Sequence, residues 1–371
     1  MKIGIITFCF SKENYGQVLQ NFALQTYLQS LGHETFTICY DGDRDFDSIF
    51  ARIKYLLSNF NPLKIYRFFI PRLLNKRAIG DIRQFSDFKT KYIPNKTDVY
   101  RTYTALCKNP PRADAYIAGS DQIWNYHLFK KYAVKNNYRT FMLDFGSDSI
   151  KRISYAASWG ITSLSKKYTK TLSSLISKFY AVSVREKSGN KICERLGRND
   201  AETVPDPTML LDVCIYEKII EENVSIEKRD KFLFLYILGE NKGFDIKKVY
   251  DFAHSKNIKV VYVTDLSNVD KWEKTYPTIP EWLWYIKNAD YVVTNSFHCS
   301  VFSILFQKHF GVIALGKKRK SLNTRVDELF ALQGIESRYI TEENFEVLEK
   351  EYLPTYFGND WLKNVLFKIQ E

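Results

Sequence analysis

Residues 292–307 read VVTNSFHCSVFSILFQ, and this stretch decides the fold expected of the second half of the chain. An apolar, strand-like run breaks at residues 294–296, and an apolar helix is predicted from about Val301. In parallel α/β sheets, ligands bind where a strand ends and a helix begins, because the helix N–H groups and dipole favour an anion there. His298 is the ionisable side chain at this break, where a histidine can bind phosphate or transfer a proton. The alternative is a capped core helix with an incidental histidine.

The first forty residues predict a βαβ unit. A β-rich apolar run at residues 2–10 leads into a polar loop at residues 11–17, then a helical pattern at residues 18–31 and a second strand pattern. The loop falls at the ligand end of the first strand, so we interpret it as a binding loop, with an ordinary connecting loop as the alternative. Its last four residues are Asn14, Tyr15, Gly16 and Gln17. It is not a GxGxxG loop, which gives a dinucleotide site little support.

Composition limits the classes of partner and compartment. A length of 371 residues suggests two domains, and the formal charge of +12 favours nucleic acid, membrane headgroups or phosphorylated substrates. No zinc finger, RNP-type motif or dense basic tail supports nucleic acid. Six scattered cysteines without a CxxC pair argue against a zinc site or disulfide framework and for a reducing compartment. The first ten residues read as a buried strand rather than a signal peptide, so we expect a cytoplasmic protein.

Residues 51–77 differ from the rest of the chain because they carry seven basic residues and no acidic ones. Aromatic and aliphatic residues fill most of the remaining positions, and Pro62 and Pro71 are expected to break the segment into short helices. Basic amphipathic helices of this kind lie on anionic membrane surfaces. The alternative is a helical insertion that packs on the sheet and keeps its cationic ends in water.

A second candidate site follows the predicted strand at residues 115–118. Ser120 and Asp121 form a sharp turn, where a carboxylate either caps the next helical turn or serves as a catalytic acid or base. Trp124 and Asn125 are of the types that line a sugar pocket. Further on, residues 138–144 and 151–158 are predicted as strands.

A third candidate is Arg185, at the end of the predicted strand that reads AVSVRE. Its guanidinium suits bidentate binding of a carboxylate or phosphate, and a surface pair with Glu186 is the alternative. Residues 201–211 contain two prolines and Asp206, and we interpret them as a linker between two domains.

Seven blocks of the chain together resemble the polysaccharide pyruvyl transferase family. They are NYGQVLQNFALQTYLQSLGHE, AYIAGSDQIWN, ISYAASWG, VSVREKSG, VPDPTMLLD, TNSFHCSVFSILF and the Arg325 loop that ends near Arg338. They occur in the family's order and span most of the chain. The resemblance implies an α/β protein with two Rossmann-like domains in a GT-B-like arrangement around a central cleft.

The same resemblance implies a division of the chain. Residues 1–205 would form the acceptor-side domain, with a basic helical insertion at residues 43–90. Residues 206–340 would form the domain that carries the phosphoenolpyruvate site around His298. Residues 341–371 would form helices that pack back on the first domain.

The implied activity is transfer of pyruvate from phosphoenolpyruvate to a sugar as a cyclic ketal, with release of phosphate. In the family, a histidine and an arginine that contact phosphoenolpyruvate correspond to His298 and Arg185. From the same block as His298, Ser296 and Phe297 are also expected to bind this donor. Several members have an arginine where this chain has Ser296, so Arg325 or residues 317–318, two lysines, are expected to supply the missing charge. No metal and no cofactor beyond this co-substrate are expected.

For the other substrate, Asp121 is the candidate base that takes the hydroxyl proton. The residues expected to bind the acceptor are Asn14, Tyr15, Gly16, Gln17, Ser120, Trp124 and Asn125. The acceptor is expected to be a bacterial capsule or exopolysaccharide repeat, carried on a polyprenyl diphosphate and met at the inner face of the cell membrane through residues 51–77. The two alternative functions are a GT-B glycosyltransferase that uses a nucleotide sugar and a non-catalytic, membrane-associated assembly protein.

Overall fold

The structure is a computed structural model that describes residues 1–11, 14–42, 45, 49–58, 83–129, 134–227, 230–239, 243–265, 270–316, 323–355 and 360–370. Most of the basic segment at residues 51–77 lies outside these ranges, as do the two lysines at residues 317–318. Of the expected insertion at residues 43–90, helices α2 (Ile49–Ser58) and α4 (Phe85–Tyr92) are described.

The N-terminal half forms a parallel sheet in the order β2-β1-β3-β4-β5-β6. Its strands are β1 (Lys2–Ile6), β2 (Glu34–Thr37), β3 (Ala115–Ala118), β4 (Lys151–Ala157), β5 (Ala181–Val184) and β6 (Glu202–Thr203). The residues of β3 are all buried, as expected of a parallel strand covered on both faces. The helices of this half are α1 (Tyr15–Ser30), α5 (Tyr103–Lys108), α6 (Val134–Phe141), α7 (Lys166–Ile176) and α8 (Lys187–Arg195), with the short 3₁₀ turn η2 (Tyr126–Leu128).

The C-terminal half forms a second parallel sheet in the order β11-β10-β9-β7-β8. Its strands are β7 (Phe232–Ile237), β8 (Lys259–Thr264), β9 (Tyr291–Thr294), β10 (Phe310–Ile313) and β11 (Tyr339–Ile340). Its helices are α9 (Val213–Asn223), α10 (Lys247–Ser255), α11 (Ile279–Asn288), α12 (Phe297–Leu305) and α13 (Thr324–Gln333), with 3₁₀ turns η3 (Pro207–Met209) and η5 (Glu346–Glu349). Two parallel sheets with flanking helices confirm the predicted α/β class.

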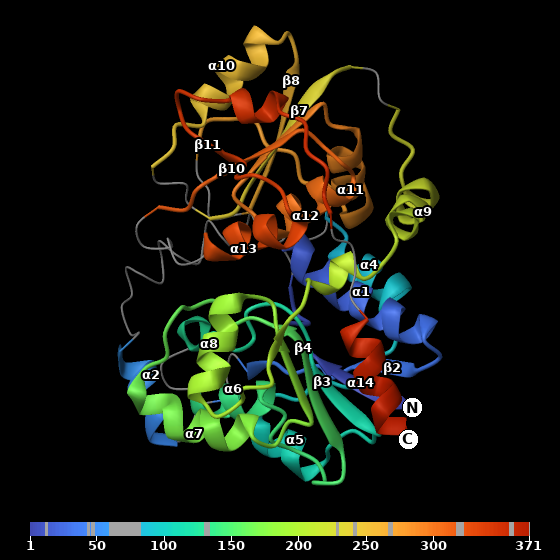
Figure 1. The fold of residues 1–371 in the computed structure, drawn as a ribbon, viewed down its shortest axis with the longest axis vertical. Helices are drawn as coiled ribbons and strands as arrows, with labels where there is room; N and C mark the ends of the chain where they lie inside the picture. Colours follow the sequence, from blue (N-terminus) through green and yellow to red (C-terminus); the bar gives the residue numbers. More distant parts are fainter. Residues whose placement is uncertain are drawn as a thin grey trace.

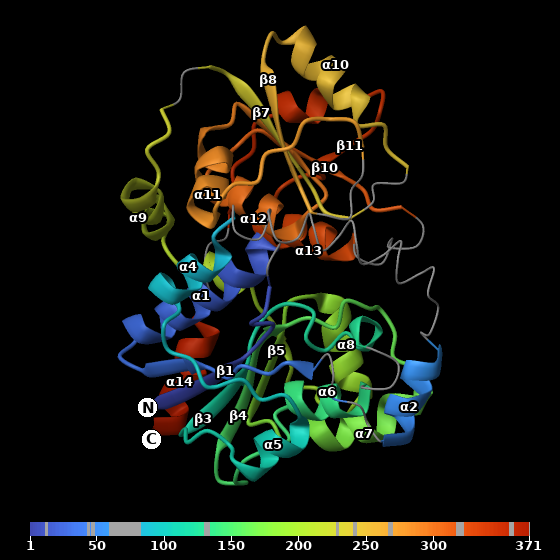
Figure 2. The same cartoon turned by 180° about the vertical axis from the view of Figure 1, so that it is seen from behind.

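The two halves share a hydrophobic core, which is built where α1 and α4 meet α9, α11 and α12 (Figures 1 and 2). Tyr15, at the first position of α1, is fully buried there. Its ring stacks on Trp282 of α11 with the ring centroids 5.0 Å apart, and its hydroxyl donates to the carbonyl oxygen of Pro277 at 2.7 Å. This contact fixes α1 against the C-terminal domain as well as against its own sheet.

The last helix, α14 (Trp361–Gln370), returns to the N-terminal sheet, and both ends of the chain lie in that half of the molecule (Figures 1 and 2). Leu362 and Leu366 are buried in one cluster with Ile3 of β1, Ile117 of β3 and Ile153 of β4. The chain therefore crosses between the domains twice.

Three sequence predictions of local structure were wrong. Arg325 was predicted to lie in a loop, but residues Thr324–Gln333 form the helix α13. Residues 138–144 were predicted as a strand, but α6 continues to Phe141, because Tyr138 and Phe141 stand one turn apart and both face the core. The loop after β1 ends at Asn14, whose side-chain oxygen caps α1, so Gly16 and Gln17 belong to the first helical turn. No described helix is long and apolar enough to cross a membrane.

Candidate functional site

The candidate site lies where the residue after β5 and the residue before η3 meet the N-terminus of α12. Arg185 follows β5 directly, Asp206 caps η3, and His298 is the second residue of α12. Each of the three side chains is more than nine-tenths buried. The fold thus places three charged or chargeable groups together in the contact between the domains.

Asp206 holds this cluster together. Its Oδ2 lies 2.9 Å from Arg185 Nη1 and 3.5 Å from His298 Nε2, and it accepts a hydrogen bond of 2.9 Å from Ser120 Oγ. Burial opposes ionisation of this carboxyl, but the charge and hydrogen bond of His298, together with Arg185, hold its pKa well below the ordinary range. Burial likewise opposes the charge of Arg185, and the neighbouring carboxylates, Glu186 first, raise its pKa.

His298 is fixed on its other side by α1. A Cβ atom built on Gly16 would lie 2.1 Å from both Cγ and Nδ1 of the His298 ring. Real carbon atoms do not approach so closely, so any side chain at this position would displace the ring or the helix. Gly16 is therefore required for the close approach of α1 to α12.

Several hydrogen-bond donors at this point have no partner among the described residues. They are Nη2 of Arg185 and the backbone N–H groups of Phe297 and His298, which begin α12 and have no intrahelical acceptor, whereas Nε2 of His298 lies 3.5 Å from Asp206. Ser296 caps α12 by accepting from the N–H of Cys299 at 3.4 Å, which gives this residue a structural role. Buried donors and a helix N-terminus together favour an anionic ligand.

Arg325 of α13 brings a second guanidinium to the same place. The Phe297 ring centroid lies 4.3 Å from Arg185 Cζ and 5.9 Å from Arg325 Cζ. Burial, and then the positive charge of Arg185, lower the pKa of Arg325 to about 10. These residues line an interdomain cavity of about 30 Å³.

Glu328 of α13 closes this cavity from the C-terminal side. Its carboxylate accepts hydrogen bonds from the backbone N–H groups of Lys187 and Ser188, the latter at 3.3 Å, at the N-terminus of α8. Burial raises its pKa above the ordinary value. A carboxylate from one domain thus occupies the anion-binding end of a helix in the other.

Asp121 lies at the edge of this cluster, at the carboxyl end of β3. Its φ of 76° is in the left-handed region, which is strained for a residue other than glycine. Oδ1 accepts from the N–H of Gln122 at 2.8 Å, while Oδ2 is buried without a partner in the described part of the chain. Its charge contributes to raising the pKa of Arg185, so the two side chains are close enough to interact.

The residues predicted to bind the acceptor are found in different environments. Tyr15, Gly16, Ser120, Trp124 and Asn125 are all buried. The Trp124 indole donates to the carbonyl of Phe141 at 3.1 Å, and Asn125 caps η2, so neither presents a free surface to a sugar in this structure.

Asn14 and Gln17 are partly exposed. Gln17 lines a cavity of about 330 Å³ beside the end of β1. Gln17 is therefore an expected acceptor residue whose side chain borders an open cavity.

Sequence inspection missed two members of the site. Residues 201–211 were interpreted as a linker, but Asp206 in their centre is buried against Arg185 and His298. Its position between two prolines was the available signal, since an aspartate before Pro207 is a typical cap. Glu328 gave no sequence signal, because its partners lie 140 residues or more away.

A family model described as polysaccharide pyruvyl transferase matches residues 14–316 of the chain. That range includes Asp121, Arg185, Asp206 and His298, and it ends before Arg325 and Glu328. No curated protein matches the chain closely enough to count as a relative. Among the described residues, no group of three or more His, Cys, Asp or Glu side chains is placed to hold a metal ion.

Solved structures agree with the chain in fold. The UDP-GlcNAc 2-epimerase of Methanocaldococcus jannaschii superposes with a TM-score of 0.55 and 12% identity, covering 100% of this chain and 99% of that one. The same enzyme in complex with UDP-GlcNAc and UDP superposes with a TM-score of 0.51 and 11% identity, again covering 100% of this chain and 99% of that one. An α-glucosyltransferase with UDP and DNA gives 0.47 and 10%, covering all of both chains. The two superpositions with TM-scores above 0.5 confirm the predicted GT-B-like arrangement of two domains.

Proposed function

The chain belongs to the polysaccharide pyruvyl transferase family, and from this premise we propose that it transfers pyruvate from phosphoenolpyruvate to a sugar as a cyclic ketal. Membership makes it a transferase of polysaccharide biosynthesis. The donor, the acceptor carrier and the place in a capsule or exopolysaccharide pathway belong to the proposal.

The observation that carries the proposal is the buried cluster of Arg185, Asp206 and His298 at the N-terminus of α12. The unpartnered Nη2 of Arg185, the first backbone N–H groups of α12 and the imidazole of His298 suit a small ligand with two anionic groups. Phosphoenolpyruvate carries a phosphate and a carboxylate on three carbons. We assign the phosphate to His298 and the α12 N-terminus, and the carboxylate to Arg185 and Arg325.

Donor entry requires a movement. A cavity of about 30 Å³ holds about one or two water molecules and is too small for phosphoenolpyruvate. The domains are fixed together along α1 and α4, whereas α8 and α13 meet on the other side through Glu328 (Figure 1). The proposal therefore includes an opening at the Glu328 contact, which lets the donor reach Arg185, Arg325 and the N-terminus of α12.

The proposed chemistry balances without a further reactant. One acceptor hydroxyl adds to C2 of the enol ester while a proton is delivered to its methylene carbon. The second hydroxyl then displaces phosphate from C2 and closes the ketal, and its proton leaves with the phosphate. Asp121, with a buried and unpartnered Oδ2, is the candidate to accept a hydroxyl proton, and His298 is the candidate to deliver one.

A lipid-linked acceptor would be met at an anionic membrane surface on the cytoplasmic side. Helix α2, at the start of the basic segment, supports this part of the proposal. Ile49 and Phe50 are 80% and 85% exposed, and Arg52 and Lys54 of the same helix are also exposed. Exposed apolar and basic side chains on one helix suit a membrane interface. Binding to anionic but not neutral liposomes at low salt, lost in Phe50→Glu, is the expected result; equal binding to both would contradict it.

The test of the function measures the products. The protein is incubated with phosphoenolpyruvate and p-nitrophenyl glycosides of galactose, mannose or N-acetylmannosamine, and phosphate release is followed together with the mass of the glycoside. A gain of pyruvate less water, abolished in a folded His298→Ala variant, is expected. Turnover with a nucleotide sugar and nucleotide release instead would favour a glycosyltransferase, the alternative that shares this fold. Undiminished turnover in the variant would refute the site.

A further inference from the structure

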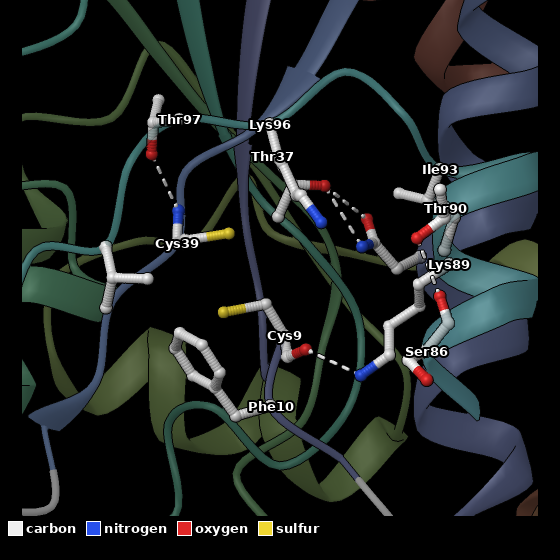
Figure 3. Close-up of a pocket in the computed structure, with 12 residues that line it drawn as sticks. Cys9, Phe10, Thr37, Cys39, Ser86, Lys89, Thr90, Ile93, Lys96 and Thr97 are labelled. Carbon is white, nitrogen blue, oxygen red and sulfur yellow. Dashed lines mark hydrogen bonds between the residues drawn. The ribbon is translucent and has the colours of Figure 1, made fainter. Parts of the chain in front are cut away.

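Two cavities flank the segment that follows β1, and their linings differ in chemistry. The first, of about 230 Å³, is lined by Lys89, Lys96 and the thiols of Cys9 and Cys39 (Figure 3). Among the described residues, the second, of about 330 Å³, is lined by aromatic, amide, hydroxyl and carboxylate side chains and by no lysine or arginine. Lys89 of α4 fixes the wall between them, because its Nζ donates to the carbonyl oxygens of Ser11 at 2.9 Å and Cys9 at 3.4 Å.

The second cavity has an aromatic wall. Its aromatic residues are Phe8, Phe10, Tyr40, Phe129 and Phe141. Phe141 lies at the centre of this wall, with its ring centroid 5.4 Å from that of Phe8, 5.8 Å from that of Tyr40 and 5.7 Å from that of Phe129. Phe10 is 45% exposed, so part of the apolar surface is open to a ligand.

Polar groups of uncharged or acidic type complete the lining. They are Ser11, Gln17, Asp41 and Asn137. Amide and carboxylate groups around an aromatic wall suit a sugar, whose C–H face packs on rings and whose hydroxyls need both donors and acceptors. A phosphate or nucleotide bound in this cavity would meet the carboxylate of Asp41. The volume is at the lower end for small-ligand sites and fits about one or two sugar rings.

The position of this cavity links it to the donor site. It lies at the carboxyl ends of β1 and β2, where ligands bind in parallel α/β sheets. Gln17 in its lining follows Gly16, against which His298 packs. Thr7, directly before Phe8, donates to the carbonyl of Ser120 at 3.0 Å, and Asp121 is the next residue.

We propose that this aromatic cavity binds an uncharged sugar ring of the acceptor and so selects which sugar reaches His298 and Asp121. The proposal rests on the proposed function, and to Gln17, which was predicted from the sequence, it adds residues that were not. In this arrangement Phe10 and Phe129 contact the ring face, and Gln17, Asp41 and Asn137 bind its hydroxyls.

The test uses Phe10→Ala and Asp41→Asn, two changes at partly or largely exposed side chains, and Lys96→Ala in the neighbouring cavity as the matched control. The first two variants should raise the KM for a p-nitrophenyl glycoside about tenfold or more, while the KM for phosphoenolpyruvate and the melting temperature stay at wild-type values. Lys96→Ala should leave all three unchanged. An unchanged KM for the glycoside in both cavity variants would overturn the proposed sugar site. Turnover by the wild-type protein in the same assay would still support the proposed function.

A binding experiment separates this inference from the proposed function. Saturation-transfer NMR detects contact between the protein and the same p-nitrophenyl glycosides without any donor. Signals that the wild-type protein gives and Phe10→Ala does not would support glycoside binding in the cavity. That result would hold even if no pyruvate were transferred, an outcome that would refute the proposed function alone. Absence of glycoside signals in the wild-type protein, or equal signals in Phe10→Ala, overturns the cavity assignment.

Discussion

Replacing Gly16 by alanine tests the closeness of α1 to His298. The added Cβ would lie 2.1 Å from two ring atoms of His298, whereas ordinary contacts begin at 3.4 Å. The ring and the helix must therefore move apart by more than 1 Å. His298 has little room to yield, because Asp206 lies 3.5 Å from its Nε2 and the residue is 5% exposed.

The expected loss is large in activity and smaller in stability. A displacement of about 1 Å at a group that binds or protonates the donor reduces kcat/KM by about 100-fold. Overpacking of the interface costs about 1–3 kcal/mol of unfolding free energy. In a helix, alanine is favoured over glycine by up to about 1 kcal/mol, so local helix weakening cannot account for a loss.

The assay compares phosphate release and melting temperature in Gly16→Ala and Gly119→Ala. Gly119 follows β3, close to Asp121, but a Cβ there would meet its neighbours at 3.4 Å or more. Gly119→Ala should retain near wild-type kcat/KM. Full activity in Gly16→Ala would refute the reasoning, because it would mean that His298 need not be held where the structure places it.

Three further predictions concern charged groups and thiols. The pKa of Asp206 is lower in the folded than in the unfolded protein, so its ionised carboxylate stabilises the folded state above the unfolded pKa of about 4, and this stabilisation declines as the pH falls. The difference in unfolding free energy between the wild type and Asp206→Asn, measured by urea titration, should therefore become smaller below about pH 4. A difference that stays constant with pH would contradict the proposed cluster. Glu328→Gln should lower the KM for phosphoenolpyruvate about two- to fivefold, because it weakens the hydrogen bonds to the N-terminus of α8 that must open before the donor enters. A higher KM would show that this carboxylate aids donor binding. A hydrogen bond from Cys9 and the nearby lysines lower the pKa of Cys39, whereas burial raises the pKa of Cys299 to about 12. Of these two buried thiols, iodoacetamide should therefore modify Cys39 before Cys299, which mass mapping would show; modification of Cys299 before Cys39 would contradict this.

Local patterns were enough to predict the strand-to-helix break at His298. Buried parallel strands are continuous apolar runs, and Ser296 is a typical cap, so residues 292–307 carry their own structural signal. The same holds for the strand that ends at Arg185. Together with the family resemblance, these patterns predicted two α/β domains.

Long-range contacts were beyond the reach of such patterns. Tyr15 resembled a loop residue, but its ring is buried on Trp282, which is 267 positions away. Glu328 was predicted to lie in the polar loop that contains Arg325, and its role depends on the backbone of Lys187 and Ser188 in the other domain. Residues 138–144 misled because aromatic residues favour strands locally, while packing of Tyr138 and Phe141 on one side favoured a helix.

The return of α14 to the first sheet has a consequence for how the protein matures on the ribosome. Domains usually fold in the order of their synthesis. Here the apolar surface formed by Ile3, Ile117 and Ile153 cannot be covered by Leu362 and Leu366 until the entire second domain has been translated. The nascent first domain therefore exposes this apolar surface while the second domain is being synthesised, and we expect chaperones to bind it during that interval. The order of translation is thus part of how the protein reaches its native state.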